Sequence, residues 1–175
     1  MSEYAIPSGD SGSLTTIEHM RALIQRALRV PLVNGMAHEI ALSAPVRDDL
    51  RIAVAIRDWL ASRFLFVRDP DGIELVREPE YMLRQLESRR YVSGDCDDCT
   101  VLGCALAKSV GIPCKIVGIG FRPNSFSHVF GVAYPRAFVR DSNNRLVGTR
   151  VPVSLDVVRP LRTTVRERRR VEFVA

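Results

Sequence analysis

The residues best suited to chemistry in this chain form the run 94–98, Gly-Asp-Cys-Asp-Asp, which leads directly into an apolar helical pattern. A cysteine in the first turn of a helix lies beside unpaired backbone N–H groups and the positive end of the helix dipole, which favour its thiolate. Because the thiolate is the nucleophilic form, Cys96 is predicted to be a reactive residue. The flanking carboxylates act in the opposite direction, since they raise a thiol pKa, and a paired imidazolium would be needed to offset them.

Two further residues follow at suitable distances. His128 lies at the start of an alternating pattern over 127–134, and Asp156 lies inside a second strand-like pattern over 151–158. A carboxylate in an apolar strand is costly unless it is paired, and an imidazole N–H is a suitable partner. That pairing would fix the tautomer whose other nitrogen accepts a thiol proton. Alone, His128 would be interpreted as a core histidine, but Cys96, His128 and Asp156 together predict a Cys-His-Asp site.

The other cysteines, Cys99, Cys104 and Cys114, have an ordinary interpretation as small apolar residues in a buried helix and strand. Cys96 and Cys99 form a C-x-x-C pair, which leaves a zinc site and a redox site as alternatives. A structural zinc site needs a second closely spaced pair, and a thioredoxin-like motif follows a strand of a βαβ unit. Neither context is predicted here, so no metal and no organic cofactor is expected.

Length and composition indicate one domain with a substantial core. The chain has 175 residues, of which 46% are apolar, and no apolar run approaches the length of a membrane span. The first thirteen residues are polar and do not resemble a signal peptide. Because all four cysteines fall between 96 and 114, we expect reduced thiols and a cytoplasmic location.

The formal net charge of +5 is concentrated near the end of the sequence. Residues 159–175 carry six arginines and two glutamates, a net +4, so the rest of the chain is close to neutral. A basic stretch of this kind can bind phosphates, but it is more often a solvated strand or helix. Nucleic acid and membrane are therefore not expected as partners.

The remaining pattern positions these residues in an α+β domain. Thr15 and Glu18 form a capping box for a first helix, a loop is expected around Pro31 and Pro45, and Asp48 begins a longer helix. The helix that begins near Cys96 is expected to start with a capping box of Asp95 and Asp98 and to end in a left-handed cap at Gly111. Strands are expected after it at about 114–121, 127–134, 136–140 and 151–158, with a hairpin turn at 141–144. We therefore expect N-terminal helices packed on a C-terminal antiparallel sheet, with the nucleophile at the start of a central helix. The expected divisions are a flexible segment 1–13, one domain 14–158 and an arginine-rich segment 159–175.

These motifs resemble the transglutaminase-like superfamily, whose members share a papain-related core. The matching stretches are 94–98, the helix end and strand 107–117 with its Val-Gly-Ile-Pro turn, 127–134, and 153–156. The resemblance implies a cysteine-dependent amide or peptide hydrolase or acyl transferase that works through a thioester. Cys96 would be the nucleophile, His128 the base and then the acid, and Asp156 the orienting acid. One departure is Phe130, where many members carry tryptophan.

The resemblance extends to small bacterial and bacteriophage forms, which implies a peptide or protein substrate and allows an association with virions. The Cys96 backbone N–H is the expected first oxyanion donor. The second donor is not assigned, and the candidates are Tyr91, Gln85 and Trp59. Two rival classes remain: a binding module that keeps the fold without turnover, and a zinc-binding protein associated with nucleic acid.

Overall fold

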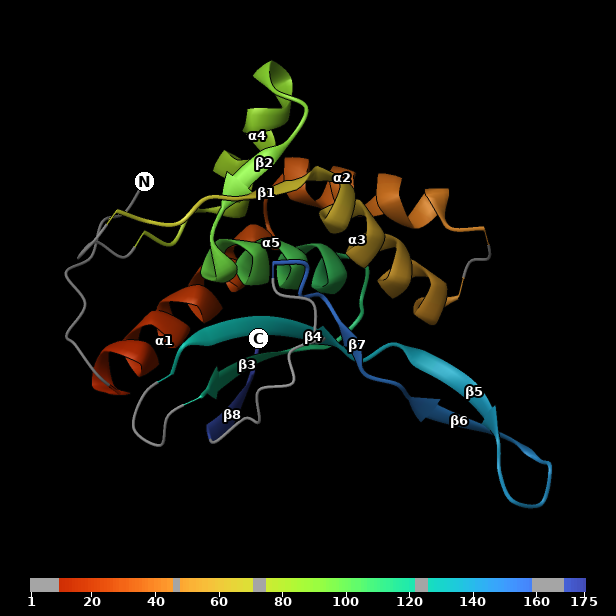
Figure 1. Ribbon diagram of the computed structural model, residues 1–175. Helices are drawn as coiled ribbons and strands as arrows, with labels where there is room; N and C mark the ends of the chain where they lie inside the picture. The colour runs from red at the N-terminus through yellow and green to blue at the C-terminus, as the bar shows by residue number, and fades with distance from the viewer. Residues whose placement is uncertain (1–9, 46–47, 71–74, 122–125, 159–168) are drawn as a thin grey trace.

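The computed structural model describes residues 10–45, 48–70, 75–121, 126–158 and 169–175. Figure 1 shows one helix, α5, lying between the other helices and a four-stranded antiparallel sheet, which confirms the expected α+β class. The elements in chain order are α1 (Asp10–Ala27), α2 (Pro31–Ser43), α3 (Asp49–Arg63), β1 (Phe64–Phe66), α4 (Pro79–Ser88), β2 (Val92–Gly94), α5 (Cys96–Ser109), β3 (Cys114–Gly120), β4 (His128–Ala133), β5 (Arg136–Arg140), β6 (Leu146–Arg150), β7 (Val153–Ser154) and β8 (Arg169–Val174). Among the helices in these ranges, none has the length and apolar character needed to cross a membrane.

The central helix α5 is fixed at both ends by local chemistry. Its N-cap Asp95 accepts hydrogen bonds from the backbone N–H groups of Asp97 at 3.0 Å and Asp98 at 3.4 Å. The Asp98 carboxylate accepts in return from the Asp95 N–H at 3.3 Å, which completes the predicted capping box. At the other end Gly111 has a φ of +80°, the left-handed conformation that suits glycine after a helix. Every residue from Asp97 to Ala107 is buried, so α5 is the centre of the core.

The sheet has the strand order β7-β4-β3-β8, and all of its pairings are antiparallel. Strand β4 carries His128 opposite Ile119 of β3. Beyond β7, the Leu155 N–H donates to the Gly131 carbonyl at 2.9 Å, which holds the following residue, Asp156, beside the start of β4. The end of the arginine-rich segment forms β8, which pairs with β3 along its full length. Residues 159–168 of that segment lie outside the described residues.

Three local expectations are wrong. Helix α1 begins at Asp10, so Thr15 and Glu18 lie inside the helix and do not cap its start. The stretch around Pro31 is helix α2 rather than a loop, because proline is accepted in the first turn and Val33, Ala37 and Ile40 bury one face at helical spacing. The strand expected over 151–158 is confined to Val153–Ser154, so Asp156 lies just after a short strand. Strand β6 (Leu146–Arg150), which lies just before the expected strand and was not predicted, forms a hairpin with β5.

The expected turn at 141–144 closes this hairpin. Asp141 Oδ1 accepts from the backbone N–H groups of Asn143 and Arg145, both at 2.9 Å, and Asn144 has a φ of +61°. The hairpin extends away from the body of the molecule (Figure 1).

Gly131 makes room for a sulfur atom between β4 and α5. A Cβ at this position would lie 2.7 Å from Cys104 Sγ, and Cys104 is fully buried. We expect Gly131→Ala to lower the free energy of unfolding by about 1–3 kcal/mol, because a packed core resists added volume. Urea denaturation measures the loss. Cys104→Ala should restore part of the stability lost in Gly131→Ala, and a double variant whose losses simply add would contradict this explanation.

Candidate active site

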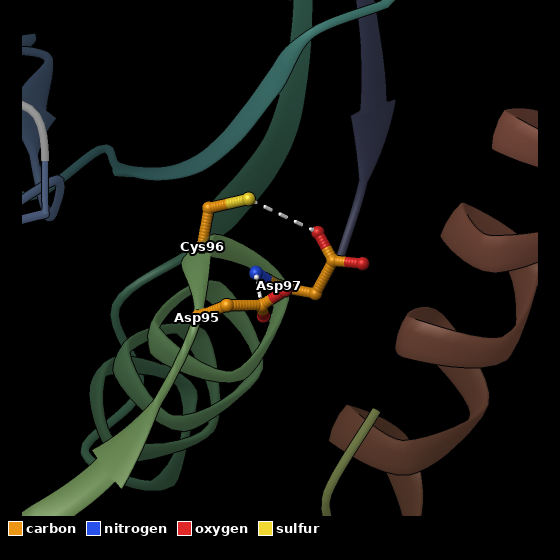
Figure 2. Close-up of side chains that lie close together, drawn as sticks. All are labelled: Asp95, Cys96 and Asp97. Carbon is orange, nitrogen blue, oxygen red and sulfur yellow. Dashed lines mark hydrogen bonds between the residues drawn. The ribbon is translucent and has the colours of Figure 1, made fainter. Parts of the chain in front are cut away.

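Cys96 is the first residue of α5 and is half-buried. The backbone N–H of Val129, the residue after His128 on β4, lies close enough to Sγ to act on the pKa of the thiol and lower it. The thiol also lies 3.5 Å from Asp97 Oδ1, to which it can donate its proton. Figure 2 shows the Cys96 sulfur and the Asp97 carboxylate meeting at the helix start, with the Asp95 carboxylate bonded to the Asp97 backbone N–H. The thiol is therefore held between the start of α5 and the histidine strand.

These surroundings raise the pKa of the Cys96 thiol above its usual range. Burial is the largest cause, followed by the negative charges of Asp97 and Asp95, while the Val129 N–H opposes them weakly. The sequence-based expectation of a thiolate favoured by the helix terminus is therefore not met in this arrangement. The thiol is protonated in the resting protein, so a base must remove its proton as it reacts.

His128 and Asp156 are in direct contact. The His128 Nε2 lies 2.7 Å from Asp156 Oδ2, and both side chains are almost fully buried. Because a carboxylate only accepts, Nε2 carries the proton of this hydrogen bond, and in a neutral imidazole Nδ1 is the nitrogen that can accept a proton. The other carboxylate oxygen, Oδ1, accepts from the Val158 N–H at 3.1 Å, and the imidazole stacks on Phe130 with a centroid distance of 5.8 Å. The imidazole thus has a fixed orientation and a defined tautomer.

Of the three predicted site residues, Cys96 begins α5 and His128 begins β4, the strand against which α5 packs. His128 and Asp156 are hydrogen-bonded, and Cys96 contacts the backbone of the residue next to His128. Among the hydrogen bonds of the described residues, none joins the thiol to the imidazole. A substrate complex would have to bring Sγ and Nδ1 into contact.

The other three cysteines are buried and, like Cys96, free of disulfides. Cys99 lies one turn after Cys96, and its Sγ packs 3.9 Å from the Leu155 carbonyl, directly before Asp156. Burial raises the pKa of the Cys99 thiol to about 12. The second cysteine of the C-x-x-C pair therefore supports the backbone that carries Asp156.

One group of side chains near Cys96 has donor atoms close enough together to hold a metal ion. Asp95, Cys96 and Asp97 place one donor atom each within 4.8 Å of one another, the one such group among the described residues (Figure 2). Asp95 Oδ1 already accepts two backbone hydrogen bonds in the helix cap. These residues therefore have a structural explanation that requires no ion.

The sequence analysis did not predict an ion pair that lies next to the start of α5. Asp98 is fully buried and accepts from the Arg77 N–H at 2.7 Å, while the Arg77 guanidinium pairs with its other oxygen. The same guanidinium lies 3.3 Å from Asp69. Gly94 is required here, since a Cβ would lie 2.3 Å from Asp98 Oδ2. Because Arg77 is 21 residues from Asp98, no local spacing could have revealed the pair.

Burial is the largest influence on the pKa values of Asp98 and Asp95. It raises the pKa of Asp98 to about 6, although Arg77 acts to lower it. The pKa of Asp95 is raised to about 7, first by burial and then by the charges of Asp98 and Asp69. The helix start that carries Cys96 thus contains two carboxyl groups that titrate close to neutral pH.

The three residues considered as the second oxyanion donor lie in different surroundings. Gln85 Oε1 accepts from the Ser93 N–H at 2.9 Å and from the Ser93 hydroxyl at 3.1 Å, so Gln85 supports strand β2 just before Cys96. Tyr91 is exposed, and Trp59 packs against the core. No second donor is assigned among them.

Cys96 is expected to alkylate first. It is half-buried, whereas Cys99, Cys104 and Cys114 are almost completely inaccessible. Its rate with iodoacetamide should rise with pH through the neutral and alkaline range, because its raised pKa leaves little thiolate at pH 7. Peptide mapping after brief labelling identifies the first site, and faster labelling of Cys99 or Cys104 would contradict the site assignment.

Asp97→Asn should speed that alkylation. The substitution removes the larger of the two charges that raise the Cys96 pKa, and each pKa unit changes the thiolate fraction about tenfold. We expect the rate at pH 8 to rise several-fold, up to about tenfold. Asp58→Asn is the matched control, because Asp58 is exposed and pairs with Arg57 on α3. Equal rates in both variants would show that Asp97 has no influence on the thiol.

Comparison with known proteins indicates the fold and the family of the chain. A solved structure described as a "putative protease" from Parabacteroides distasonis superposes with a TM-score of 0.51 at 12% identity, a likeness that shows the fold. The alignment covers 89% of this chain and 34% of that protein, so the chain spans about a third of its length. No curated protein matches the chain with a significant score. The family model described as the transglutaminase-like superfamily matches residues 37–145, more than half of the sequence and both Cys96 and His128, and the chain belongs to that superfamily.

Proposed function

We propose that the protein is a cysteine-dependent amide hydrolase acting on peptides or proteins, with Cys96 as nucleophile, His128 as base and acid, and Asp156 as orienting acid. The observation that carries the proposal is the 2.7 Å hydrogen bond between His128 and Asp156, next to the strand position that contacts the Cys96 thiol. A buried imidazole with one nitrogen held by a carboxylate and the other free is suited to accept a thiol proton.

The first half of the reaction forms a thioester. As Sγ of Cys96 attacks the amide carbonyl carbon, its proton passes to Nδ1 of His128. The carbonyl oxygen becomes an oxyanion, which the backbone N–H at the start of α5 would stabilise. Collapse of this intermediate breaks the C–N bond, and the imidazolium returns its proton to the departing amine. Asp156 stabilises the imidazolium throughout these transfers.

The second half releases the acid. Water attacks the thioester carbon and gives a proton to His128, and the C–S bond then breaks as Sγ recovers that proton. We favour hydrolysis over transfer to a second amine, because the thiol is only half-buried and water is present at a far higher concentration than any amine. Transamidation would require an amine held in place while water is excluded.

A competition assay tests the reaction type. The protein is incubated with peptide and glutamine-containing substrates together with a labelled primary amine, and Cys96→Ala provides the blank. We expect hydrolysed product in excess of amine incorporation, and neither with Cys96→Ala. Amine incorporation that dominates and disappears in Cys96→Ala would reverse the order of the two reactions.

One observation favours a second candidate, a binding module without turnover. The raised pKa of the Cys96 thiol, caused by burial and by Asp97 and Asp95, works against a nucleophile. A peptide aldehyde that forms a hemithioacetal with Cys96 would distinguish an active site from a silent one. Absence of both the adduct and hydrolysis, in protein whose Cys96 still alkylates at high pH, would support the binding module.

A further inference from the structure

The β5–β6 hairpin is a formed structure whose contacts with the other described residues lie at its base. Every residue from Phe138 to Arg150 is exposed. The base is fixed by the Val151 N–H, which donates to the Pro135 carbonyl at 3.1 Å, and by the Arg136 N–H, which donates to Asp49 of α3 at 3.3 Å. Together with the hydrogen-bonded turn at Asp141, these contacts give an ordered arm that projects from the molecule (Figure 1).

The arm exposes apolar side chains on both of its faces. Residues that pair directly across a ladder share a face. One face therefore carries Phe138, which is 74% exposed, and Leu146, which is 61% exposed. The opposite face carries the directly paired Val139 and Val147, both more than 40% exposed. An ordered ribbon with unburied apolar residues on two faces is typical of an interaction surface.

The charge of the arm indicates what kind of partner it fits. Its span 136–150 contains four arginines and one aspartate, a net charge of +3. The guanidinium groups of Arg140 and Arg150 donate to backbone carbonyls, those of Asn144 and Tyr134. Within the part of the chain that the structure describes, none of the four arginines has a carboxylate partner. Arginine beside exposed aromatic and aliphatic residues is the composition enriched at protein interfaces.

We propose that the β5–β6 arm is a docking surface for an extended acidic segment of the protein substrate. This deepens the proposed function and rests on it for the identity of the partner as substrate. A two-stranded ribbon offers unpaired backbone groups at its outer edges, where an extended segment can add as a further strand. Carboxylates of that segment would pair with the arginines, and its apolar side chains would cover Phe138 on one face or Val139 and Val147 on the other.

Two other occupants fit the arm less well. A second copy pairing arm to arm would bring two surfaces of charge +3 together, which is repulsive. The phosphates of a nucleic acid would pair with the arginines, but they would not bury the exposed aliphatic side chains on the two faces. Both occupants are included as outcomes of the test.

The test measures binding in Cys96→Ala protein, so that no turnover is required and failure of the proposed chemistry cannot be mistaken for failure of docking. The probe is a fluorescein-labelled 14-residue peptide of alternating glutamate and valine, followed by fluorescence anisotropy. A peptide with lysine in place of glutamate and a 14-nucleotide single strand, alone and as a duplex, serve as competitors.

The arm variant is Arg136→Glu with Arg145→Glu, because the hydrogen bonds of both residues described here come from their backbone N–H groups and are preserved. The matched control is Arg29→Glu with Arg89→Glu, two exposed arginines outside the arm that also bond through the backbone. A third variant, Phe138→Ser, tests the apolar contribution. Circular dichroism and the thermal midpoint confirm that each variant is folded.

We expect the acidic peptide to bind about tenfold or more weakly to the arm variant and several-fold more weakly to Phe138→Ser, with the control pair close to the parent. Equal loss in the control pair would overturn the proposal, because it would show an effect of net charge alone. Tighter binding of either oligonucleotide through the arm, or equal binding of the lysine peptide, would also overturn it. A change in oligomeric state that follows the arm variants would assign the surface to a second copy instead.

Discussion

His128→Ala is expected to lower kcat/KM for amide hydrolysis by at least about a thousandfold, because the variant loses both the base that deprotonates Cys96 and the acid that protonates the leaving amine. Because the Cys96 thiol is protonated at rest, activity should depend on His128 more strongly than it would if Cys96 were already a thiolate. Alkylation of Cys96 should also become slower between pH 6 and 8. Initial rates on the peptide substrate and iodoacetamide labelling of the same preparations measure the two effects.

His38→Ala is the matched control, since His38 is exposed on α2 and its imidazole contacts only a backbone carbonyl among the hydrogen bonds described here. It should retain activity and Cys96 reactivity. Asp156→Asn keeps an oxygen for the Val158 N–H but removes the charge that holds the imidazolium, so we expect a large loss of kcat with a smaller loss of stability. If His128→Ala left Cys96 reactivity unchanged across this pH range, the assignment of His128 as base would be wrong.

Arg77→Met is expected to lower the free energy of unfolding by about 3–5 kcal/mol at pH 7, because it leaves the fully buried Asp98 carboxylate without its cation. The pKa of Asp98, already raised to about 6 by burial, should rise further in this variant. A carboxyl group whose folded pKa exceeds its unfolded value binds more protons in the folded state, so stability falls as pH rises. The defect should therefore be larger at pH 7 than at pH 5, as measured by urea denaturation at both values.

Two variants serve as controls for this experiment. Arg77→Met combined with Asp98→Asn removes both charges and keeps a side-chain oxygen for the backbone N–H at position 77, so it should recover much of the loss. Arg57→Met breaks an exposed pair with Asp58 and should cost about 0.5 kcal/mol or less. A loss in Arg77→Met that did not change between pH 5 and pH 7 would show that Asp98 is not the cause.

The sequence predicted the fold where local signals and burial agree. The capping box at Asp95, the left-handed turn at Gly111 and the tip of the 141–144 turn each depend on a few adjacent residues, so they were predictable. The helix at Pro31 was not predicted, because proline favours a loop, although Val33, Ala37 and Ile40 have the spacing of a buried helical face. The hairpin strand β6 was missed because its residues are all exposed and lack the alternation of a half-buried strand.

The site was predictable in part. The contact of His128 with Asp156 follows the chain order Cys-His-Asp and is present in the structure. The state of the thiol was not predictable, because its pKa depends on burial and on the orientation of Asp97, neither of which spacing specifies. The Arg77–Asp98 pair joins two segments through tertiary packing, which a single sequence does not encode at any regular interval.

Because α5 is enclosed by other elements, the reactivity of its buried residue Cys104 can report unfolding of the whole domain. Helices α1 to α4 cover one side of α5, and strands β3 and β4 cover the other. We therefore expect that local fluctuations do not expose its amides or the thiol of Cys104 to solvent. Hydrogen exchange along Asp97–Ala107 should therefore proceed only when the whole domain unfolds. In native buffer, the rate at which a thiol reagent labels Cys104 would then measure the rate of unfolding, while the faster labelling of Cys96 on the same helix occurs in the folded protein.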